Sequence, residues 1–245
     1  MRGRADESAG RVTSIIGAGT GYANWRVMNV LEQRVEISAG RDLVLDADIA
    51  VPDDERGIVL FAHGSGSSRH SPRNRAVASE LQAAGLATVL VDLLTVHEEQ
   101  VDAATGHLRF DIDLLSGRLI AIVDWLVDTE PAARGGIGLF GASTGAGGAL
   151  VAAAARPEAV TTVVSRGGRP DLAGSFLPLV RQPTLLIVGE LDAAVIKLNR
   201  AAMGELGGDT RIEIVAAASH LFEEPGTLQM VAELAREWFV HHLRR

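Results

Sequence analysis

Polar and apolar residues alternate in the first regular part of the chain and then give way to wholly apolar runs. Residues 34–38 and 43–49 alternate, as half-exposed antiparallel strands do, and we expect them to form a hairpin at one edge of a sheet. Later runs are short and apolar nearly throughout, which is typical of strands buried on both faces. These runs are residues 57–62, 87–91, 136–140, 160–164, 184–188 and 211–215.

Segments with helical spacing separate the apolar runs. Ser71 and Pro72 supply a capping serine and a proline at the first helical position. Between residues 112 and 126, apolar residues recur on a single face, and the pattern stops before Pro131. Strands and helices that alternate after an initial hairpin predict an α/β domain with a mainly parallel, doubly wound sheet. Further helices are expected over residues 143–155, 193–206 and 226–240.

The first 30 residues differ from the rest of the chain. They are rich in Gly, Ala, Ser and Arg, so we expect residues 1–30 to be a loosely ordered leader and residues 31–245 to be a single domain. The run Gly17–Gly21 resembles a dinucleotide-binding fingerprint. Because the sequence shows neither a full strand before it nor a clear helix after it, we favour a loop there.

Composition and charge narrow the possible functions. At 47% hydrophobic and 22% charged residues, the chain is too apolar for disorder and too interrupted for a membrane span. The formal net charge is -8 and the basic residues are not clustered, which argues against nucleic-acid binding. The start of the chain lacks a secretory core segment, so we expect a cytoplasmic protein with no membrane partner.

The chain has no cysteine, which excludes disulfides, thiolate metal sites and a cysteine nucleophile. The strongest chemical signal is instead a serine between two glycines, in Gly141–Gly145 (GASTG), after an apolar run and before a small-residue helix. Such a tight turn holds the serine in strained geometry with its hydroxyl above the sheet, and the glycines remove side chains that would collide. The pattern predicts Ser143 as a nucleophile, with an incidental serine at a glycine-rich helix start as the alternative.

A serine hydroxyl is too weakly acidic to attack unaided, so a base and a group that orients the base are needed. Asp192 follows the apolar run 184–188, and His220 follows the run 211–215. The order Ser, Asp, His is that of hydrolases built around a nucleophile elbow. Loops after parallel strands open on the same edge of a sheet. We therefore expect His220 to accept and return the proton of Ser143, and Asp192 to orient His220.

Each partner of the serine has an alternative. Glu190 lies two residues before Asp192 and could orient the histidine instead. Four of the seven histidines precede the serine and two lie in the C-terminal tail, which favours His220 as the base over a solvated loop histidine.

A third loop, His63–Ser68 (HGSGSS), follows another apolar run. Two backbone N–H groups aimed at the oxygen of a tetrahedral intermediate lower its barrier by ~3 kcal/mol each. We expect the amides of Ser65 and Thr144 to form this oxyanion hole, with the glycines of the loop allowing it to turn inward. A phosphate-binding loop is the alternative, but the segment lacks the Gly-Lys-Ser/Thr ending.

Taken together, these motifs resemble the α/β-hydrolase fold in its dienelactone-hydrolase-like branch. Residues 164–173 (VSRGGRPDLA) and 220–225 (HLFEEP) are similar to a subgroup found alone or joined to a phosphoribosyltransferase-like domain, which we do not expect in this chain. The resemblance spans about residues 33–240 and implies a serine hydrolase of carboxylic esters without a metal or organic cofactor. Dienelactone hydrolases proper use a cysteine nucleophile, so Ser143 argues against dienelactone itself as substrate.

Two intervals bear on the size of the substrate. Residues 165–183 are too few for a large helical cap, so we expect a shallow or loop-roofed pocket that takes small or short-acyl esters. The loop 93–110 is the other candidate wall. We expect its acidic residues Glu98, Glu99 and Asp102 to be solvated rather than ligands.

Arginines lie near the expected catalytic edge. Arg69 follows the oxyanion loop, and Arg166 and Arg169 flank a pair of glycines. Because a guanidinium can bind a carboxylate with two hydrogen bonds, Arg69 and Arg166 are candidate substrate-binding residues. The favoured alternative is structural pairing, with Asp171 or with the loops themselves.

The leading hypothesis is a cytoplasmic serine esterase that acts on a small-molecule ester as a monomer or homodimer, since every catalytic group lies in one chain. A non-catalytic protein that binds a ligand or a partner on the same scaffold remains an alternative. So does an acyltransferase or perhydrolase, in which another nucleophile replaces water at the acyl-enzyme.

Overall fold

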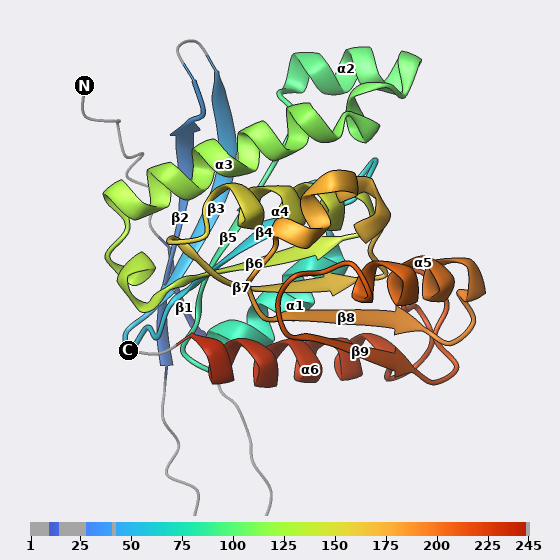
Figure 1. The fold of residues 1–245 in the computed structure, drawn as a ribbon. Helices are drawn as coiled ribbons and strands as arrows, with labels where there is room; N and C mark the ends of the chain where they lie inside the picture. Colours follow the sequence, from blue (N-terminus) through green and yellow to red (C-terminus); the bar gives the residue numbers. More distant parts are fainter. Residues whose placement is uncertain (1–9, 15–27, 41–42, 244–245) are drawn as a thin grey trace, which may run out of the picture.

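The computed structural model describes residues 10–14, 28–40 and 43–243. In this part of the chain a single sheet runs through the molecule with helices on both of its faces (Figure 1). Its strands are β1 Gly10–Ser14, β2 Met28–Ser38, β3 Val44–Pro52, β4 Ile58–Ala62, β5 Ala87–Val91, β6 Ile137–Ala142, β7 Val160–Arg166, β8 Thr184–Gly189 and β9 Thr210–Val215. Its helices are α1 Pro72–Ala83, α2 Val96–Thr105, α3 Ile112–Thr129, α4 Thr144–Ala155, α5 Ala193–Met203 and α6 Thr227–His242, with short 3₁₀ segments η1 Leu108–Phe110, η2 Pro131–Gly135 and η3 Pro170–Leu179.

The sheet confirms the expected architecture. The strand order is β1-β2-β3-β5-β4-β6-β7-β8-β9. The hairpin β2–β3 lies toward one edge and pairs antiparallel with its neighbours β1 and β5, whereas every pairing from β5 to β9 is parallel. Between β7 and β8 the chain forms the short η3 rather than a large helical cap.

The expectation of a loose leader over residues 1–30 falls mostly outside the described residues. Within that range the structure describes β1, which pairs antiparallel with the first part of β2, Gly10 opposite Glu32 and Ser14 opposite Met28. The glycine run Gly17–Gly21 also lies outside the described residues.

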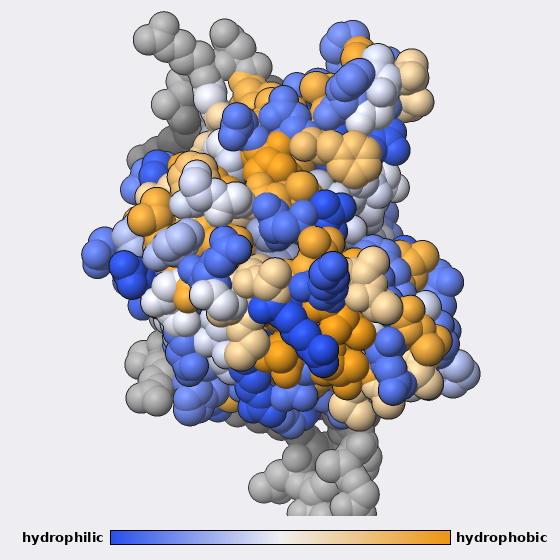
Figure 2. All heavy atoms as spheres, turned by 45° about the vertical axis from the view of Figure 1, so that its right-hand side comes forward, coloured by the Kyte–Doolittle hydropathy of each residue, from blue (hydrophilic) through white to orange (hydrophobic). Residues whose placement is uncertain are grey.

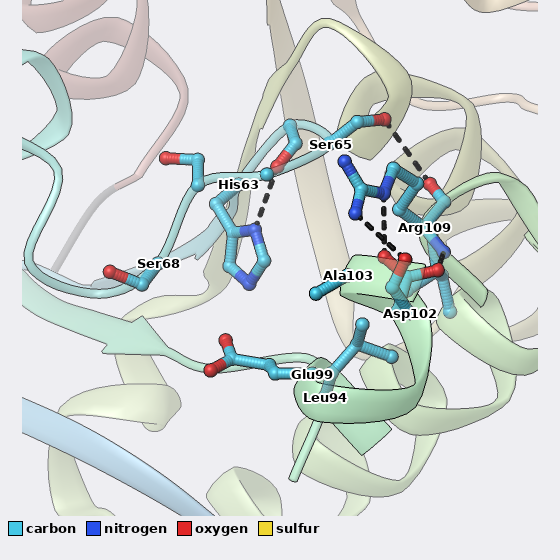
Figure 3. A pocket seen from close by; sticks show the side chains of 12 residues that line it. His63, Ser65, Ser68, Leu94, Glu99, Asp102, Ala103 and Arg109 are labelled. Atoms are coloured by element: carbon cyan, nitrogen blue, oxygen red, sulfur yellow. Dashed lines mark hydrogen bonds and ion pairs between the residues drawn. The ribbon is translucent and has the colours of Figure 1, made fainter. Parts of the chain in front are cut away.

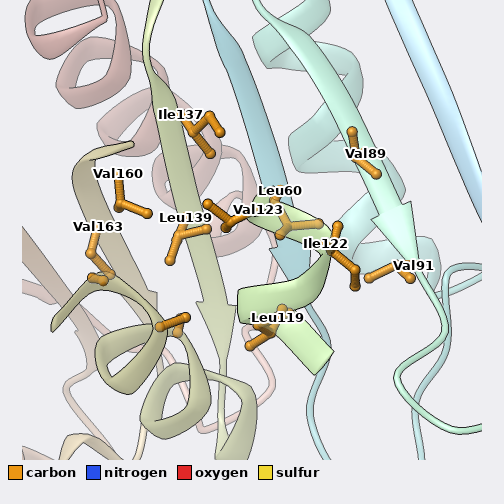
Figure 4. Packing of buried hydrophobic residues seen from close by; sticks show 14 of the residues in the cluster. Leu60, Val89, Val91, Leu119, Ile122, Val123, Ile137, Leu139, Val160 and Val163 are labelled. Carbon is orange, nitrogen blue, oxygen red and sulfur yellow. The ribbon is translucent and has the colours of Figure 1, made fainter. Parts of the chain in front are cut away.

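Helices cover the two faces of the sheet with separate apolar clusters. On one face, Leu119, Ile122 and Val123 of α3 pack against strand residues such as Leu60 and Leu139 (Figure 4). On the other face, α1 and α6 pack on a cluster that includes Phe140 and Val164. Because the parallel strands are covered on both sides, their side chains are apolar in both directions, which explains the unbroken apolar runs in the sequence.

The strand order places a crevice where the catalytic loops begin. From β4 the chain moves outward to β5 and then returns to form β6 on the other side of β4. Loops that leave the carboxyl ends of β4 and β6 therefore diverge at this reversal, and ligands of doubly wound sheets bind at such a point. The arrowheads of β7 and β8 in Figure 1 point to this same edge.

The helix α2 is a departure from the expected loop 93–110. Its start is a capping box, in which the Thr95 hydroxyl accepts the Glu98 N–H and the Glu98 carboxylate accepts the Thr95 N–H. The spacing Thr-x-x-Glu is a recognisable helix start, so the sequence contained the signal. The remaining expected helices are confirmed, with ends that differ by a few residues.

Candidate active site

Ser143 is the single residue between strand β6 and helix α4. Its φ of 50° and ψ of -121° lie in a region that non-glycine residues seldom occupy. Its N–H donates to the carbonyl of Arg166 at 3.1 Å, while its own carbonyl accepts the N–H groups of Ala146 and Arg169. Its side chain makes no capping hydrogen bond to α4, so the hydroxyl is available to a group across the cleft.

The glycines that flank Ser143 are required by close contacts. A Cβ at Gly141 would lie 2.4 Å from the Cα of Ala146, and one at Gly145 would lie 2.3 Å from the carbonyl oxygen of Ala62. Neither contact can be relieved by rotating a side chain, because both involve backbone atoms. The G-x-S-x-G spacing therefore has a steric reason at each of its glycines.

The three residues expected to act together do meet. The Oγ of Ser143 lies 3.3 Å from Nε2 of His220, and Nδ1 of His220 lies 2.6 Å from Oδ2 of Asp192. Asp192 is also the N-cap of α5, where its Oδ1 accepts the N–H of Val195. One oxygen of Asp192 is therefore held by the helix while the other faces the imidazole.

Glu190, the alternative partner of the histidine, has a different contact. Its Oε2 accepts the backbone N–H of Ala217 at 2.8 Å. Glu224 acts similarly from the other side, since its Oε2 accepts the N–H of Ser219 at 3.0 Å. Hydrogen bonds from Ser219 hold the pKa of Glu224 below its usual value. No local spacing in the sequence signals this contact of Glu224 with the loop before His220.

The loop after β4 lies directly against the nucleophile. A Cβ at Gly64 would be 3.0 Å from the Cβ of Ser143. The Ser65 hydroxyl lies 2.8 Å from that of Thr144, which ties this loop to the start of α4. Neither the Ser65 nor the Thr144 amide has a hydrogen-bond acceptor among the described residues. The two amides expected to form an oxyanion hole therefore have no competing acceptor in the described part of the chain.

His63 braces this loop from below. Its Nδ1–H donates to the carbonyl of Gly64 at 2.9 Å, and its Nε2 accepts the N–H of Leu93 at 3.0 Å. Burial lowers the pKa of His63, because the charged imidazole would lose its hydration. His63 is therefore held as the neutral tautomer that carries its proton on Nδ1.

A cavity of ≈ 350 Å³ opens between this loop and α2 (Figure 3). Leu94, Ala103 and Leu115 contribute apolar surface to it. On its far wall, Arg109 donates to Asp102 through Nε at 2.5 Å and through Nη2 to the Asp102 carbonyl. In Figure 3 the third nitrogen of Arg109 points back toward the loop of Ser65.

The expectation that the acids of residues 93–110 are solvated is wrong for two of them. Asp102 is 3% exposed and pairs with Arg109, and Glu98 pairs with the buried Arg118. Burial by itself would raise the pKa of Glu98, but hydrogen bonds from Arg118 and Thr95 lower it to about 2. These ion pairs attach α2 to the rest of the domain. They form because the segment is a helix, whereas in an exposed loop the two acids would be solvated.

The arginines near the catalytic edge divide into paired and unpaired. Arg69 forms ion pairs with Asp92 and, at 3.4 Å, with Asp48, so its charge is balanced within the protein, as the structural alternative proposed. Arg169 pairs with Asp171 in the same way. Arg166 is 7% exposed and makes no side-chain hydrogen bond or ion pair with any residue that the structure describes.

The face above the strand ends combines apolar and charged surface. Turned toward the viewer in Figure 2, it shows apolar patches interrupted by hydrophilic side chains. Leu191 and Leu221, the immediate neighbours of Asp192 and His220, are 65% and 39% exposed.

No helix of the described residues combines the length and the apolar character needed to cross a membrane.

Comparison with known proteins places this arrangement in context. A crystallised dienelactone hydrolase from Anabaena variabilis is 58% identical in sequence, with a TM-score of 0.85 over 87% of this chain and 98% of that chain. The protein Est1E from Butyrivibrio proteoclasticus is 15% identical but has a TM-score of 0.71 over 85% of this chain and 98% of its own, which is a similarity of fold alone. No family model matches the sequence.

A sequence relative of a different name is also found. A putative phosphoribosyl transferase of Mycobacterium tuberculosis is 52% identical over 212 residues, which are 86% of this chain and 47% of the relative. The chain therefore spans about half the length of the curated relatives it matches.

Proposed function

Since this chain belongs to the dienelactone-hydrolase-like α/β hydrolases, we propose that it is a serine hydrolase that cleaves small carboxylic esters through an acyl-enzyme on Ser143. The observation that carries the proposal is the unbroken series of contacts from Oγ of Ser143 to Nε2 of His220, and from Nδ1 of His220 to Asp192. Each residue has the chemistry that its place in the series requires.

The proposed reaction has two halves. Ser143 Oγ attacks the acyl carbon and gives its proton to Nε2 of His220, while Asp192 accepts the hydrogen bond from Nδ1 and stabilises the imidazolium. The negative charge that forms on the carbonyl oxygen is stabilised by the amides of Ser65 and Thr144. The tetrahedral intermediate then collapses, its ester C–O bond breaks, and the proton on His220 passes to the departing alcohol.

The second half regenerates the enzyme. His220 takes a proton from water, whose oxygen attacks the acyl carbon of the Ser143 ester through a second tetrahedral intermediate. The carbon–Oγ bond breaks, the proton on His220 returns to Oγ, and the carboxylic acid leaves. The oxyanion amides act in both halves, and each is expected to lower the barrier by ~3 kcal/mol.

The cavity beside Ser65 supports a short, uncharged acyl group. Its volume of ≈ 350 Å³ lies at the small end of ligand pockets. Arg109 and Asp102 neutralise each other within its wall, and Glu99 adds a carboxylate to the lining. A negative charge on the acyl group would therefore meet a net negative wall, whereas Leu94 and Leu115 favour an apolar chain.

Reaction with a fluorophosphonate, read by intact mass, tests the proposal. The unmodified protein should gain one phosphonyl group and Ser143→Ala none, and that variant should lower kcat by about 10⁶-fold if Ser143 is the nucleophile. With p-nitrophenyl esters, we expect kcat/KM to be highest for acetyl and butyryl groups and to fall about tenfold or more for octanoyl, because the longer chain exceeds the cavity.

Other outcomes would identify the alternatives. The absence of both adduct and turnover would favour a non-catalytic binding protein. An adduct with acyl transfer to added alcohol or peroxide in preference to water would favour an acyltransferase or perhydrolase. Arg118→Ala, which releases Glu98 and hence α2, should change the acyl-length preference without removing the adduct.

A further inference from the structure

Asn199 is a buried polar residue of α5. Its exposed fraction is 0%, and its Nδ2 group donates to the carbonyl of Gly168 at 2.9 Å and, one turn earlier in the helix, to that of Val195 at 2.8 Å. Its Oδ1 is enclosed without a hydrogen bond to any residue that the structure describes. An enclosed amide oxygen without a partner costs free energy, which an apolar side chain would avoid. What an apolar side chain could not supply is the hydrogen bond to Gly168.

The Gly168 carbonyl belongs to the loop after β7, which is hydrogen-bonded to the backbone of Ser143. The Ser143 N–H donates to the carbonyl of Arg166, the last residue of β7, at 3.1 Å, and the N–H of Arg169 donates to the Ser143 carbonyl at 3.0 Å. Gly168 lies between these two contacts and is buried. Among the described residues no backbone N–H reaches its carbonyl, so Asn199 supplies the donor. The position of this loop, and with it that of Ser143, therefore depends on α5.

The loop after β7 also lies against the catalytic base. Gly167 has a φ of 51°, and a Cβ there would be 3.2 Å from the carbonyl oxygen of His220 and 3.5 Å from its Nδ1. A Cβ at Gly168 would be 2.6 Å from the Cβ of Ala146 in α4. The loop thus fits closely between the helix that follows the nucleophile and the histidine. A small shift of the loop would change the 3.3 Å separation between Ser143 Oγ and His220 Nε2.

The helix that holds this loop is also the helix that begins at the catalytic acid. Asp192 is the N-cap of α5, its Oδ1 accepts the N–H of Val195, and its Oδ2 lies 2.6 Å from Nδ1 of His220. The carbonyl of the same Val195 accepts the second hydrogen bond of Asn199. Within about two turns of helix, Asn199 therefore connects the residue that orients the base to the loop that holds the nucleophile.

We propose that Asn199 is a positioning residue, whose hydrogen bond to Gly168 fixes the loop after β7 relative to α5 and so sets the distance between Ser143 and His220. The proposal rests on the proposed esterase function and adds to it a residue outside the cavity beside Ser65. A misplacement of about 1 Å can lower the rate of an enzyme by about 100-fold. A hydrogen bond remote from the substrate can therefore act on kcat without changing how the substrate binds.

Asn199→Leu tests the proposal, because it removes the donor and keeps a side chain of similar size. With p-nitrophenyl acetate we expect kcat to fall about tenfold, with the concentration of active enzyme taken from the fluorophosphonate adduct on Ser143. Both halves of the reaction use the same contact between Ser143 and His220, so both should slow together and KM should change by less than about twofold. If Asn199→Leu does not fold, Asn199→Ala decides, because it also removes the donor and adds no atom that could collide.

Gln182→Met is the matched control. Gln182 is 5% exposed, its Nε2 donates to the carbonyl of Ala153 at 2.8 Å, and its Oε1 is likewise enclosed without a partner among the described residues. Ala153 lies at the opposite end of α4 from Ser143. Each variant loses one buried amide, so both should lower the Tm, but Gln182→Met should leave kcat within about twofold. An unchanged kcat in Asn199→Leu, or an equal fall in both variants, would overturn the proposal.

The failure of the positioning role differs from the failure of the enzyme. If the unmodified protein neither hydrolyses the ester nor gains a phosphonyl group, the proposed function fails. The role of Asn199 is then read from amide hydrogen exchange, which reports local opening. The N–H groups of Ser143 and Arg169 should exchange faster in Asn199→Leu than in the unmodified protein, and not in Gln182→Met. Unchanged exchange in Asn199→Leu would overturn the positioning role as well.

Discussion

The loop that carries the nucleophile and the loop that carries the base both contain residues in strained backbone geometry, but different contacts hold that geometry in each. Among the described residues, the non-glycine positions with positive φ are Ser143, Ala217 and Phe222. The first forms the elbow, and the other two lie on either side of His220. Both loops therefore store backbone strain, of order 1–3 kcal/mol at each such residue.

They differ in what holds the strain. The elbow is held by backbone packing, because Gly141 and Gly145 allow α4 and the loop after β4 to approach closely. The loop before His220 has no glycine and is held by carboxylates, Glu190 on the Ala217 N–H and Glu224 on the Ser219 N–H. The elbow is thus fixed by the close packing of backbone around its two glycines, whereas the histidine loop depends on hydrogen bonds to two carboxylate side chains.

The largest effect is expected where the elbow is obstructed. Gly145→Ala places a Cβ 2.3 Å from the Ala62 carbonyl oxygen and 2.5 Å from that of His63. Because these are backbone atoms, we expect a loss of about 3 kcal/mol or more in the free energy of unfolding, and loss of most esterase activity. Urea denaturation and kcat/KM measure the two effects.

Gly117→Ala is the control, because Gly117 lies in α3 with nothing within 4 Å of the added Cβ. It should raise the free energy of unfolding by up to about 1 kcal/mol, since alanine is the better helix former. If Gly145→Ala behaved like Gly117→Ala, steric packing would not be what holds the elbow.

The next largest effect is expected in the histidine loop, when the Glu190 carboxylate is removed with alanine or with glycine at residue 217. Glu190→Ala removes the acceptor of the Ala217 N–H and should lower kcat/KM by about 3- to 10-fold, through loss of the His220 position. Ala217→Gly removes the cost of a left-handed alanine, about 1 kcal/mol. In the Ala217→Gly background, Glu190→Ala should then lower kcat/KM by less, about twofold.

The four proteins form a double-mutant cycle, and Glu190→Gln, which keeps an acceptor oxygen, should restore most of the activity. An equal loss from Glu190→Ala in both backgrounds would show that Glu190 does not act by holding the strained Ala217. The phosphonyl adduct on Ser143 should form in every member of the cycle, since none alters the elbow.

This contrast explains how far the sequence was informative. The elbow is a local steric requirement, so the spacing of Gly141, Ser143 and Gly145 predicts it directly. The strands could also be predicted from the sequence, because burial on both faces favours apolar residues throughout runs such as residues 184–188. Chain order and the common edge of parallel strands were then enough to predict that Asp192 and His220 would meet Ser143.

Contacts between side chains that are distant in sequence were not readable in this way. Nothing in the local pattern says that Glu98 meets Arg118, or that Asp102 lies buried against Arg109 rather than in water. The same holds for Glu224, which comes after the histidine, and for Arg166, whose distinguishing feature is the absence of a partner among the described residues. The role of a charged side chain can be assigned only when the structure shows which groups contact it.

The smallest expected effect is a pH-dependent difference in Tm that involves the histidine loop and not the elbow. Hydrogen bonds from Ser219 lower the pKa of Glu224 from 4.5, so the carboxylate's contribution to stability is present above that pH and is lost as the pH falls through the lower folded value. Glu224→Gln keeps an acceptor for the Ser219 N–H but cannot titrate. Its Tm should therefore lie slightly below that of the unmodified protein at pH 7, and the two should converge as the pH falls below 4.5. Glu237→Gln, which changes an exposed glutamate of α6, should show no such convergence. A constant difference for Glu224→Gln across this range would mean that the histidine loop is held, like the elbow, by packing that does not titrate.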